Sequence, residues 1–188
     1  RADRGHALHM GIAEAGKLRA VAGDHTEALR HYREALKLAR STGAPEVFFR
    51  HYTQCVLESL EHTGSYGEVM EFCEKALRHF DGIEKPLDLH RRDQAATLER
   101  LAINLIKAGR ADEAREPLEK AVALAGRNDV PVARTVLDWM QRGMALPAER
   151  ICEVQAKRGY FTVTVTSVEP ERAMPLPQTT PPRAGMEL

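Results

Sequence analysis

The stretch Ala22-Gly-Asp-His-Thr-Glu-Ala-Leu-Arg-His-Tyr-Arg-Glu-Ala-Leu36 decides the fold, because it returns twice, from Thr63 and from Ala108. Each copy carries a glycine, a glutamate four residues later and an alanine twelve residues later. These residues are Gly23, Glu27 and Ala35, then Gly64, Glu68 and Ala76, then Gly109, Glu113 and Ala121. Gly64 follows Gly23 by 41 residues and Gly109 follows Gly64 by 45. Repetition at this period predicts a stacked array of helical hairpins.

The composition excludes several classes of partner. The chain has 188 residues, and its 27 Lys and Arg residues equal its 27 Asp and Glu residues. A formal net charge of zero removes the electrostatic argument for nucleic acid or anionic lipid as a partner. No apolar run approaches the roughly 20 residues of a membrane span. The three cysteines, at 55, 73 and 152, lack metal-type spacing, which favours reduced thiols in a cytoplasmic protein.

Apolar stripes at helical spacing, closed by glycine or proline, predict eight helices. Their expected ranges are 7–22, 24–42, 45–62, 65–81, 89–108, 112–125, 131–142 and 147–157. Asp24 and Ser65 are expected to cap the helices that they precede. Pro117 is expected to bend its helix, because it lies six residues inside. Residues 1–145 are therefore interpreted as a helical repeat domain, with a capping helix at 146–158.

The chain changes character at 159–169. Phe161, Val163 and Val165 alternate with threonines, a pattern that predicts a β-strand. A lone strand needs a partner for its backbone amides, so two copies of the chain would pair here, or another protein or a missing segment would supply the partner strand. The alternative is an extended tail in solvent. The proline-rich segment 170–188 is expected to be extended and weakly structured.

No set of residues in the sequence indicates catalysis. A Ser/His/Asp set, a phosphate-binding loop and zinc-type spacing are all missing, so we expect no enzyme, no cofactor and no metal. His6 and His9, three residues apart, could share a metal ion, but such a pair is more often part of a surface face.

The repeats resemble tetratricopeptide repeats (TPRs). The small and large residues of the family pattern fall in the first unit on Gly16, Ala28, Tyr32 and Ala35, and in the third on Ala102, Ala114, Leu118 and Ala121. The second unit, with Leu57, Val69, Cys73 and Ala76, matches more loosely. Since the period exceeds the usual length of about 34 residues, the chain resembles the long-helix subtype found in kinesin light chains and bacterial peptide-sensing regulators.

This resemblance implies an all-α, right-handed solenoid whose first helix in each unit lines a concave groove. Such a groove binds an extended peptide or a helix of a partner protein. Glu14 lies on the implied groove face. The residues that the resemblance assigns to partner binding are Lys17, His51, Gln54, Glu58, His62, Glu99, Arg100, Ile103 and Lys107. Of the five positions of the family's carboxylate clamp only Arg100 is retained, so a chaperone-tail clamp is not expected.

The sequence thus predicts a cytoplasmic, non-enzymatic scaffold or adaptor of seven to eight helices. A C-terminal strand and a proline-rich tail would serve oligomerisation or a second contact. The alternative is the ligand- or peptide-sensing arm of a bacterial transcription or signalling regulator. The partner would be a protein or peptide, with no nucleic acid and no membrane.

Overall fold

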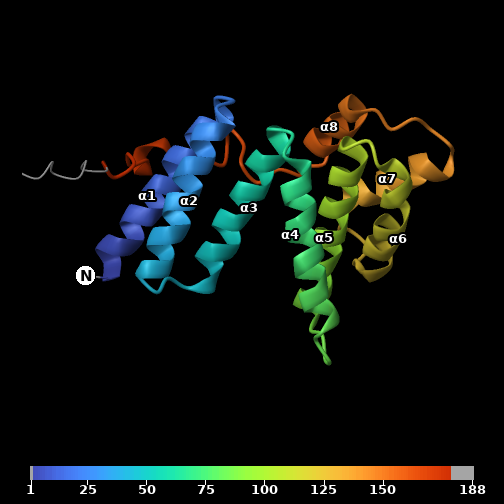
Figure 1. The fold of residues 1–188 in the computed structure, drawn as a ribbon, viewed down its shortest axis with the longest axis horizontal. Helices are drawn as coiled ribbons and strands as arrows, with labels where there is room; N and C mark the ends of the chain where they lie inside the picture. Colours follow the sequence, from blue (N-terminus) through green and yellow to red (C-terminus); the bar gives the residue numbers. More distant parts are fainter. Residues whose placement is uncertain (1, 179–188) are drawn as a thin grey trace, which may run out of the picture. The chain divides into compact units, whose positions relative to one another are not determined.

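All regular secondary structure is helical in residues 2–178, the part of the chain that the computed structural model describes (Figure 1). The predicted all-α class is therefore confirmed. Within these residues, no helix combines the length and the apolar character that crossing a bilayer requires. The elements are α1 (Ala2–Val21), α2 (His25–Ser41), α3 (Glu46–His62), α4 (Tyr66–Asp81), α5 (Asp88–Lys107), the 3-10 helix η1 (Ala111–Ala114), α6 (Arg115–Leu124), α7 (Pro131–Gln141), α8 (Ala148–Lys157) and the 3-10 helix η2 (Pro170–Arg172).

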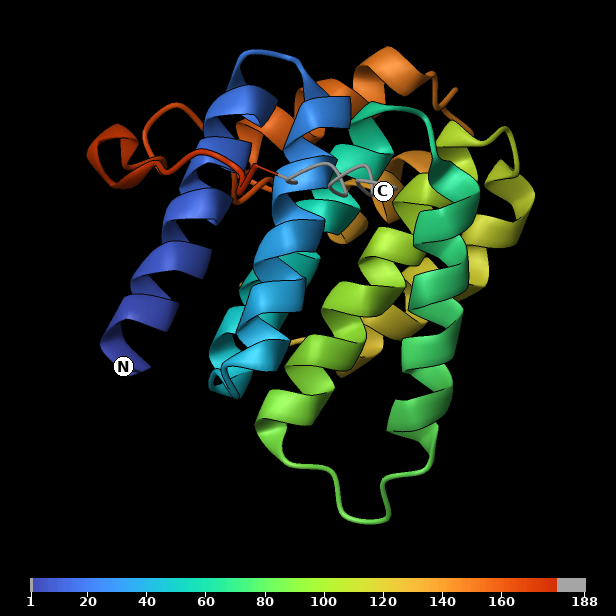
Figure 2. The ribbon, with the colours of Figure 1, turned by 60° about the vertical axis from the view of Figure 1, so that its left-hand side comes forward.

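The chain forms two compact units whose boundary falls inside α3. The first unit consists of residues 1–56 and of the returning segment from Val163, and the second unit consists of residues 57–162. In the first unit α1 and α2 run antiparallel and side by side (Figures 1 and 2). In the second unit α4 and α5 form a similar antiparallel pair, joined by the loop that contains Pro86.

The repeated glycines end helices because each adopts a left-handed backbone. The φ angles of Gly23, Gly64 and Gly109 are +85°, +76° and +80°, a region that side chains with a Cβ disfavour. The predicted cap at Asp24 is present, since its carboxylate accepts the Glu27 amide at 3.1 Å.

The predicted cap at Ser65 is wrong. Its side chain makes no capping bond to α4, because the Ser65 hydroxyl lies 3.0 Å from the hydroxyl of Thr63 instead. The expected bend at Pro117 is also wrong. A 3-10 segment, η1, precedes α6, so that Pro117 falls in the first turn of an α-helix that begins at Arg115. The first-turn amides of a helix have no partner within it, and a proline there loses no hydrogen bond.

Small residues bring α1 and α2 together in the first unit. Gly16 lies against the side chains of His31 and the fully buried Tyr32, in keeping with its place in the repeat pattern. Ala28 and Cys55, also fully buried, complete this cluster. A second cluster contains Ile12, Ala13, Ala35, Ala39, Ala44 and Tyr52.

The core of the second unit is continuous from α4 to α8. Its largest members come from α5, α6 and α7, which lie against one another. They include Leu98, Ile103, Leu105, Ile106, Leu118, Val132, Val136 and Leu137, with Ile151 and Val154 from α8. Cys73 is fully buried in α4, and burial raises the pKa of its thiol to about 12, which keeps it protonated and unreactive.

The predicted strand at 159–169 is wrong, since the described residues contain no strand. A turn closes here, in which the Ser167 amide donates to the Thr164 carbonyl at 3.1 Å. Phe161 and Val163 are half-buried, but Val165 is 75% exposed, so the alternation does not produce one buried face.

Side chains take the place of the missing partner strand. The amides of Thr162, Thr164 and Glu169 donate to side-chain oxygens of Glu58 at 2.6 Å, Ser167 at 2.9 Å and Glu14 at 2.8 Å, respectively. These three amides are therefore satisfied without a neighbouring strand. The described residues therefore offer no strand through which two copies would pair.

The proline-rich segment is only partly extended. It begins with the 3-10 helix η2, and residues 173–178 have no regular secondary structure. The rest of the predicted tail, 179–188, lies outside the described residues.

Gly16→Ala and Gly67→Ala are expected to change stability in opposite directions. A Cβ on Gly16 would lie 2.8 Å from both His31 Cβ and Tyr32 Cε1, whereas a Cβ on Gly67 would meet nothing within 4 Å. Overpacking at Gly16 should lower the unfolding free energy by about 1–3 kcal/mol. Alanine at Gly67 should leave it unchanged or raise it by up to about 1 kcal/mol. Urea unfolding followed by circular dichroism measures both, and equal effects would contradict the packing described.

Candidate functional site

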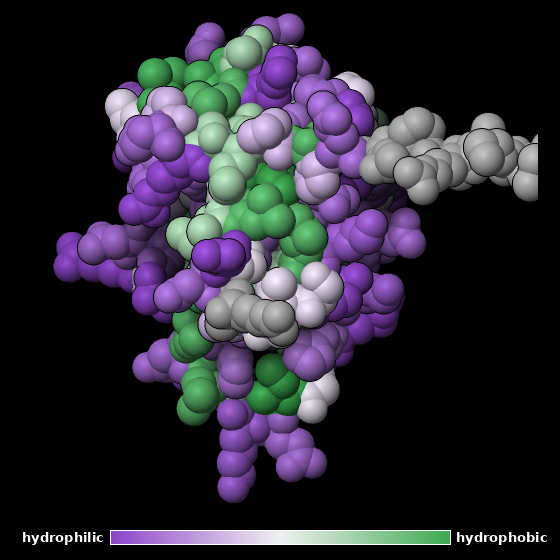
Figure 3. All heavy atoms as spheres, turned by 90° about the vertical axis from the view of Figure 1, so that its left-hand side faces the viewer, coloured by the Kyte–Doolittle hydropathy of each residue, from purple (hydrophilic) through white to green (hydrophobic). Residues whose placement is uncertain are grey.

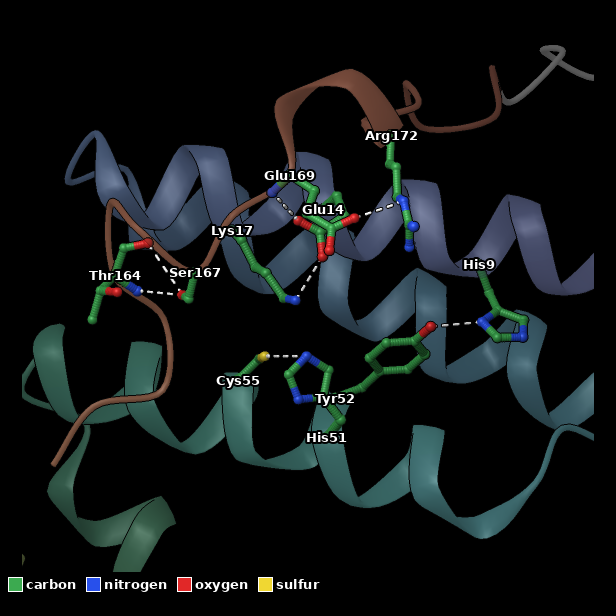
Figure 4. Close-up of polar contacts among 10 residues, drawn as sticks. All are labelled: His9, Glu14, Lys17, His51, Tyr52, Cys55, Thr164, Ser167, Glu169 and Arg172. Carbon is green, nitrogen blue, oxygen red and sulfur yellow. Dashed lines mark hydrogen bonds and ion pairs between the residues drawn. The ribbon is translucent and has the colours of Figure 1, made fainter. Parts of the chain in front are cut away.

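The returning C-terminal segment lies against helix α1 in the first unit (Figure 4). One carboxylate oxygen of Glu14 accepts the backbone amide of Glu169 at 2.8 Å, and the other accepts Lys17 Nζ at 2.7 Å. The Gly11 carbonyl accepts the amide of Met174 at 2.9 Å. Two main-chain bonds to one helix therefore fix residues 169–174 on α1.

Gly11 makes this close approach possible. A Cβ at position 11 would lie 2.6 Å from Met174 Sδ and 2.8 Å from the Arg172 carbonyl oxygen. The second of these contacts is with backbone, which cannot rotate away as the end of a side chain can. A residue larger than glycine at position 11 is therefore incompatible with the segment in this place.

The charges at this contact are paired within each element. The Glu14 and Lys17 side chains are 12% and 9% exposed, so their ion pair is largely shielded from water. On the segment itself, Arg172 Nε lies 2.6 Å from Glu169 Oε2. The α1 face therefore presents a neutral ion pair rather than a net charge. The carboxylate oxygen of Glu14 that does not bind Lys17 accepts a main-chain amide.

A chain of hydrogen bonds links α1 to α3 beside this contact. Tyr52 Oη lies 2.6 Å from His9 Nδ1, and His9 Nε2 lies 3.0 Å from His6 Nδ1. A neutral His9 fits both bonds, accepting from the tyrosine and donating to His6. Burial lowers the pKa of His9, and the charge that His6 can carry lowers it further.

In the second unit, residues 160–162 lie on α3 and α5. The Glu58 carboxylate accepts the Thr162 amide at 2.6 Å, and the Phe161 ring lies 4.4 Å from the His62 ring, centroid to centroid. Arg100 Cζ lies 5.6 Å from the centre of the Tyr160 ring, a cation–π contact inside a buried region. Main-chain and ring contacts together hold this short stretch.

A buried carboxylate, Glu61, joins three helices beneath that stretch. Its two oxygens accept Asn104 Nδ2 at 3.0 Å, Lys107 Nζ at 3.0 Å and Gln155 Nε2 at 2.7 Å. The side chains of Glu61 and Lys107 are 0% and 6% exposed. Lys107 thus combines a buried ion pair with a position 6.0 Å from the centre of the Phe161 ring.

The structure divides the predicted partner-binding residues into three groups. Glu58, His62, Arg100 and Lys107 touch residues 160–162, as described above. Lys17 pairs with Glu14, Cys55 Sγ lies 3.9 Å from His51 Nε2, and Gln54 is half-buried.

The last two predicted partner-binding residues, Glu99 and Ile103, point into the core of the second unit instead. Glu99 accepts the Ala133 amide at 2.8 Å, and burial raises its pKa. Ile103 is fully buried. Of the three residues assigned to strand pairing, Phe161 contacts the His62 ring at a tilt, Val163 packs beside Cys55, and Val165 faces solvent.

Sequence reasoning missed Gly11, Glu61 and Gln155. A signal for Gly11 was available, because an isolated glycine in an alanine- and leucine-rich helix often marks a close approach. The sequence holds no comparable signal for Glu61 or Gln155, which lie 94 residues apart.

Residues 94–127 match the tetratricopeptide repeat family, and they cover most of α5, all of η1 and all of α6. This match supports the resemblance to tetratricopeptide repeats that was inferred from the sequence. No curated protein and no solved structure matches the chain. Repeats of this family are typical of protein-interaction modules. Among the described residues, no group of three or more His, Cys, Asp or Glu side chains is arranged to hold a metal ion.

Removing the Glu61 carboxylate is expected to destabilise the protein strongly. Glu61→Ala leaves the Lys107 ammonium and the amides of Asn104 and Gln155 buried without an acceptor. The expected loss is about 3–5 kcal/mol of unfolding free energy. Glu116→Ala removes an exposed ion pair with Lys120 and is the matched control, with little change expected. Thermal and urea unfolding measure both, and similar losses in the two variants would contradict the network.

The stability is expected to fall as the pH drops below 6.5, in part because of His9. The unfolded state takes up a proton near pH 6.5, whereas the buried ring takes one up only at lower pH. The contribution of His9 is therefore complete above pH 6.5 and is lost as the pH falls through its folded pKa. His9→Gln should flatten the decrease in melting temperature between pH 7 and pH 5. His79→Gln, at an exposed position, should not, and identical pH profiles for the wild type and His9→Gln would refute this.

Proposed function

We propose that this protein is a non-enzymatic scaffold or adaptor whose hairpins stack as a right-handed solenoid and bind a segment of a partner polypeptide. In the second unit, the binding face would be formed by α5 and by the part of α3 that belongs to that unit. The observation that supports this most directly is the seating of residues 160–162 on Glu58, His62, Arg100 and Lys107. Four of the residues assigned to the groove thus already contact a polypeptide segment, which happens to belong to the same chain.

The chemistry of these contacts suits a peptide better than other ligands. A carboxylate that accepts a main-chain amide recognises any extended polypeptide, whatever its sequence. An imidazole and a guanidinium beside it offer flat surfaces for aromatic side chains. The zero formal net charge of the chain gives no preference for the phosphates of a nucleic acid. The partner we propose is therefore a protein segment with at least one aromatic residue.

Selection of peptides on the full chain tests this function. Extended peptides displayed on phage are panned against the protein, and selected peptides are synthesised for titration. Glu58→Gln and His62→Ala should each weaken their binding tenfold or more, because one removes the charged acceptor and the other a ring surface. Glu119→Gln, on the exposed side of α6, is the control and should leave affinity unchanged. A selection without binders, or binders indifferent to both groove variants, would reject the proposal.

A further inference from the structure

The segment that lies on α1 comes from the C-terminal part of the same chain, and it covers a face of the first unit that lies outside the site proposed above. We propose that the α1 face around Gly11 and Glu14 is a docking surface for an extended partner segment, and that residues 169–176 occupy it as an internal competitor. This inference rests on the proposed function and adds a second binding surface, in the first unit, together with its regulation.

Residues 169–176 contact α1 as a bound ligand would, and they are less buried than residues of a hydrophobic core. They consist of the two main-chain bonds to α1 and of apolar contacts at the edge of a cluster. Met174 remains 39% exposed, and the Arg172 side chain remains 57% exposed. Leu176 is only partly buried against the cluster that contains Ile12 and Tyr52. Release of the segment would therefore leave the fully buried residues of the first unit in place.

Gly11 supplies the strongest structural argument. A glycine in a helix interior is unfavourable relative to alanine, because it restricts the unfolded chain less. Nothing in α1 itself requires it, since Gly11 does not have a positive φ angle. The close approach of Met174 and of the Arg172 carbonyl explains it, because both would collide with a Cβ. The face is thus shaped for main chain lying directly on the helix.

The same face defines the chemistry of the partner. Glu14 requires a free backbone amide, and the Gly11 carbonyl requires a second amide five residues further along. An unbranched apolar side chain then fits across Gly11, as Met174 does. Figure 3 shows a band of apolar residues, bordered by hydrophilic ones, on the side of the molecule that faces the viewer. The Glu14–Lys17 pair is neutral and does not select for charge, so the partner is defined as an extended segment that carries methionine or leucine.

Tethering gives the internal segment an advantage over any partner in solution. A short flexible connection holds a ligand at an effective concentration on the order of millimolar. A partner must exceed that competition, so the apparent affinity of the intact chain is lowered. Weakening the segment, without touching α1, should restore the intrinsic affinity of the face.

The test uses a fluorescent peptide with the sequence of residues 163–178 as the probe, titrated into full-length proteins by polarisation. The wild type should bind it weakly. Met174→Asp, which places a charge on the apolar contact of the internal segment, should bind it at least tenfold more tightly. Adding Gly11→Ala to Met174→Asp should abolish that gain, whereas adding Gly67→Ala should preserve it. Circular dichroism checks that all variants keep the wild-type helicity.

Three outcomes would overturn the inference. Equal affinity in the wild type and Met174→Asp would show that the internal segment does not compete. Retained binding after Gly11→Ala would place the peptide elsewhere. A wild-type dimer in light scattering that becomes a monomer with Met174→Asp would show that a second copy, and not the same chain, fills the face. The proposed function is judged separately by the Glu58 and His62 variants of the second unit, so either can fail while the other stands.

Discussion

The carboxylate of Glu61 is the constraint on which the second unit depends. A charge at this depth is tolerated only with compensating donors, and α5 and α8 provide three of them. The network fixes the position of α8, whose short length and few apolar residues would otherwise hold it weakly. The end of α8 in turn sets where residues 160–162 begin, and thereby places them on Glu58 and His62. A buried polar network thus determines where residues 160–162 lie.

The helices could be predicted from the sequence because local signals specify them. Gly23, Gly64 and Gly109 mark helix ends through their own backbone preference, which requires no knowledge of neighbours. Pro117 was misjudged because its effect depends on where the helix begins, and that start moved when Ala111–Ala114 adopted a 3-10 conformation. The strand at 159–169 failed for a related reason. Its amides were satisfied by Glu58 and Glu14, acceptors more than a hundred residues away.

The candidate site was predictable as a face but not as a set of contacts. The resemblance to known repeats places Glu58, His62, Arg100 and Lys107 on one side of their helices, because helical spacing fixes which residues share a face. It places Ile103 there as well, although that side chain is buried in the core. A rotation of the helix by a fraction of a turn decides whether a side chain lies on the binding face or in the core. The sequence pattern does not resolve such a rotation. Nor does any pattern show that the chain itself supplies the segment on that face.

Gly11 carries a consequence for the evolution of this chain. Alanine there would strengthen α1 on its own, so selection for helix stability alone would remove the glycine. What accounts for glycine at this position is a segment more than 150 residues away, at Arg172 and Met174. In descendants that lose or rewrite that segment, position 11 becomes free to drift toward alanine. Position 11 and the segment at Arg172 and Met174 would thus vary together among homologues, depending on whether the segment binds to α1.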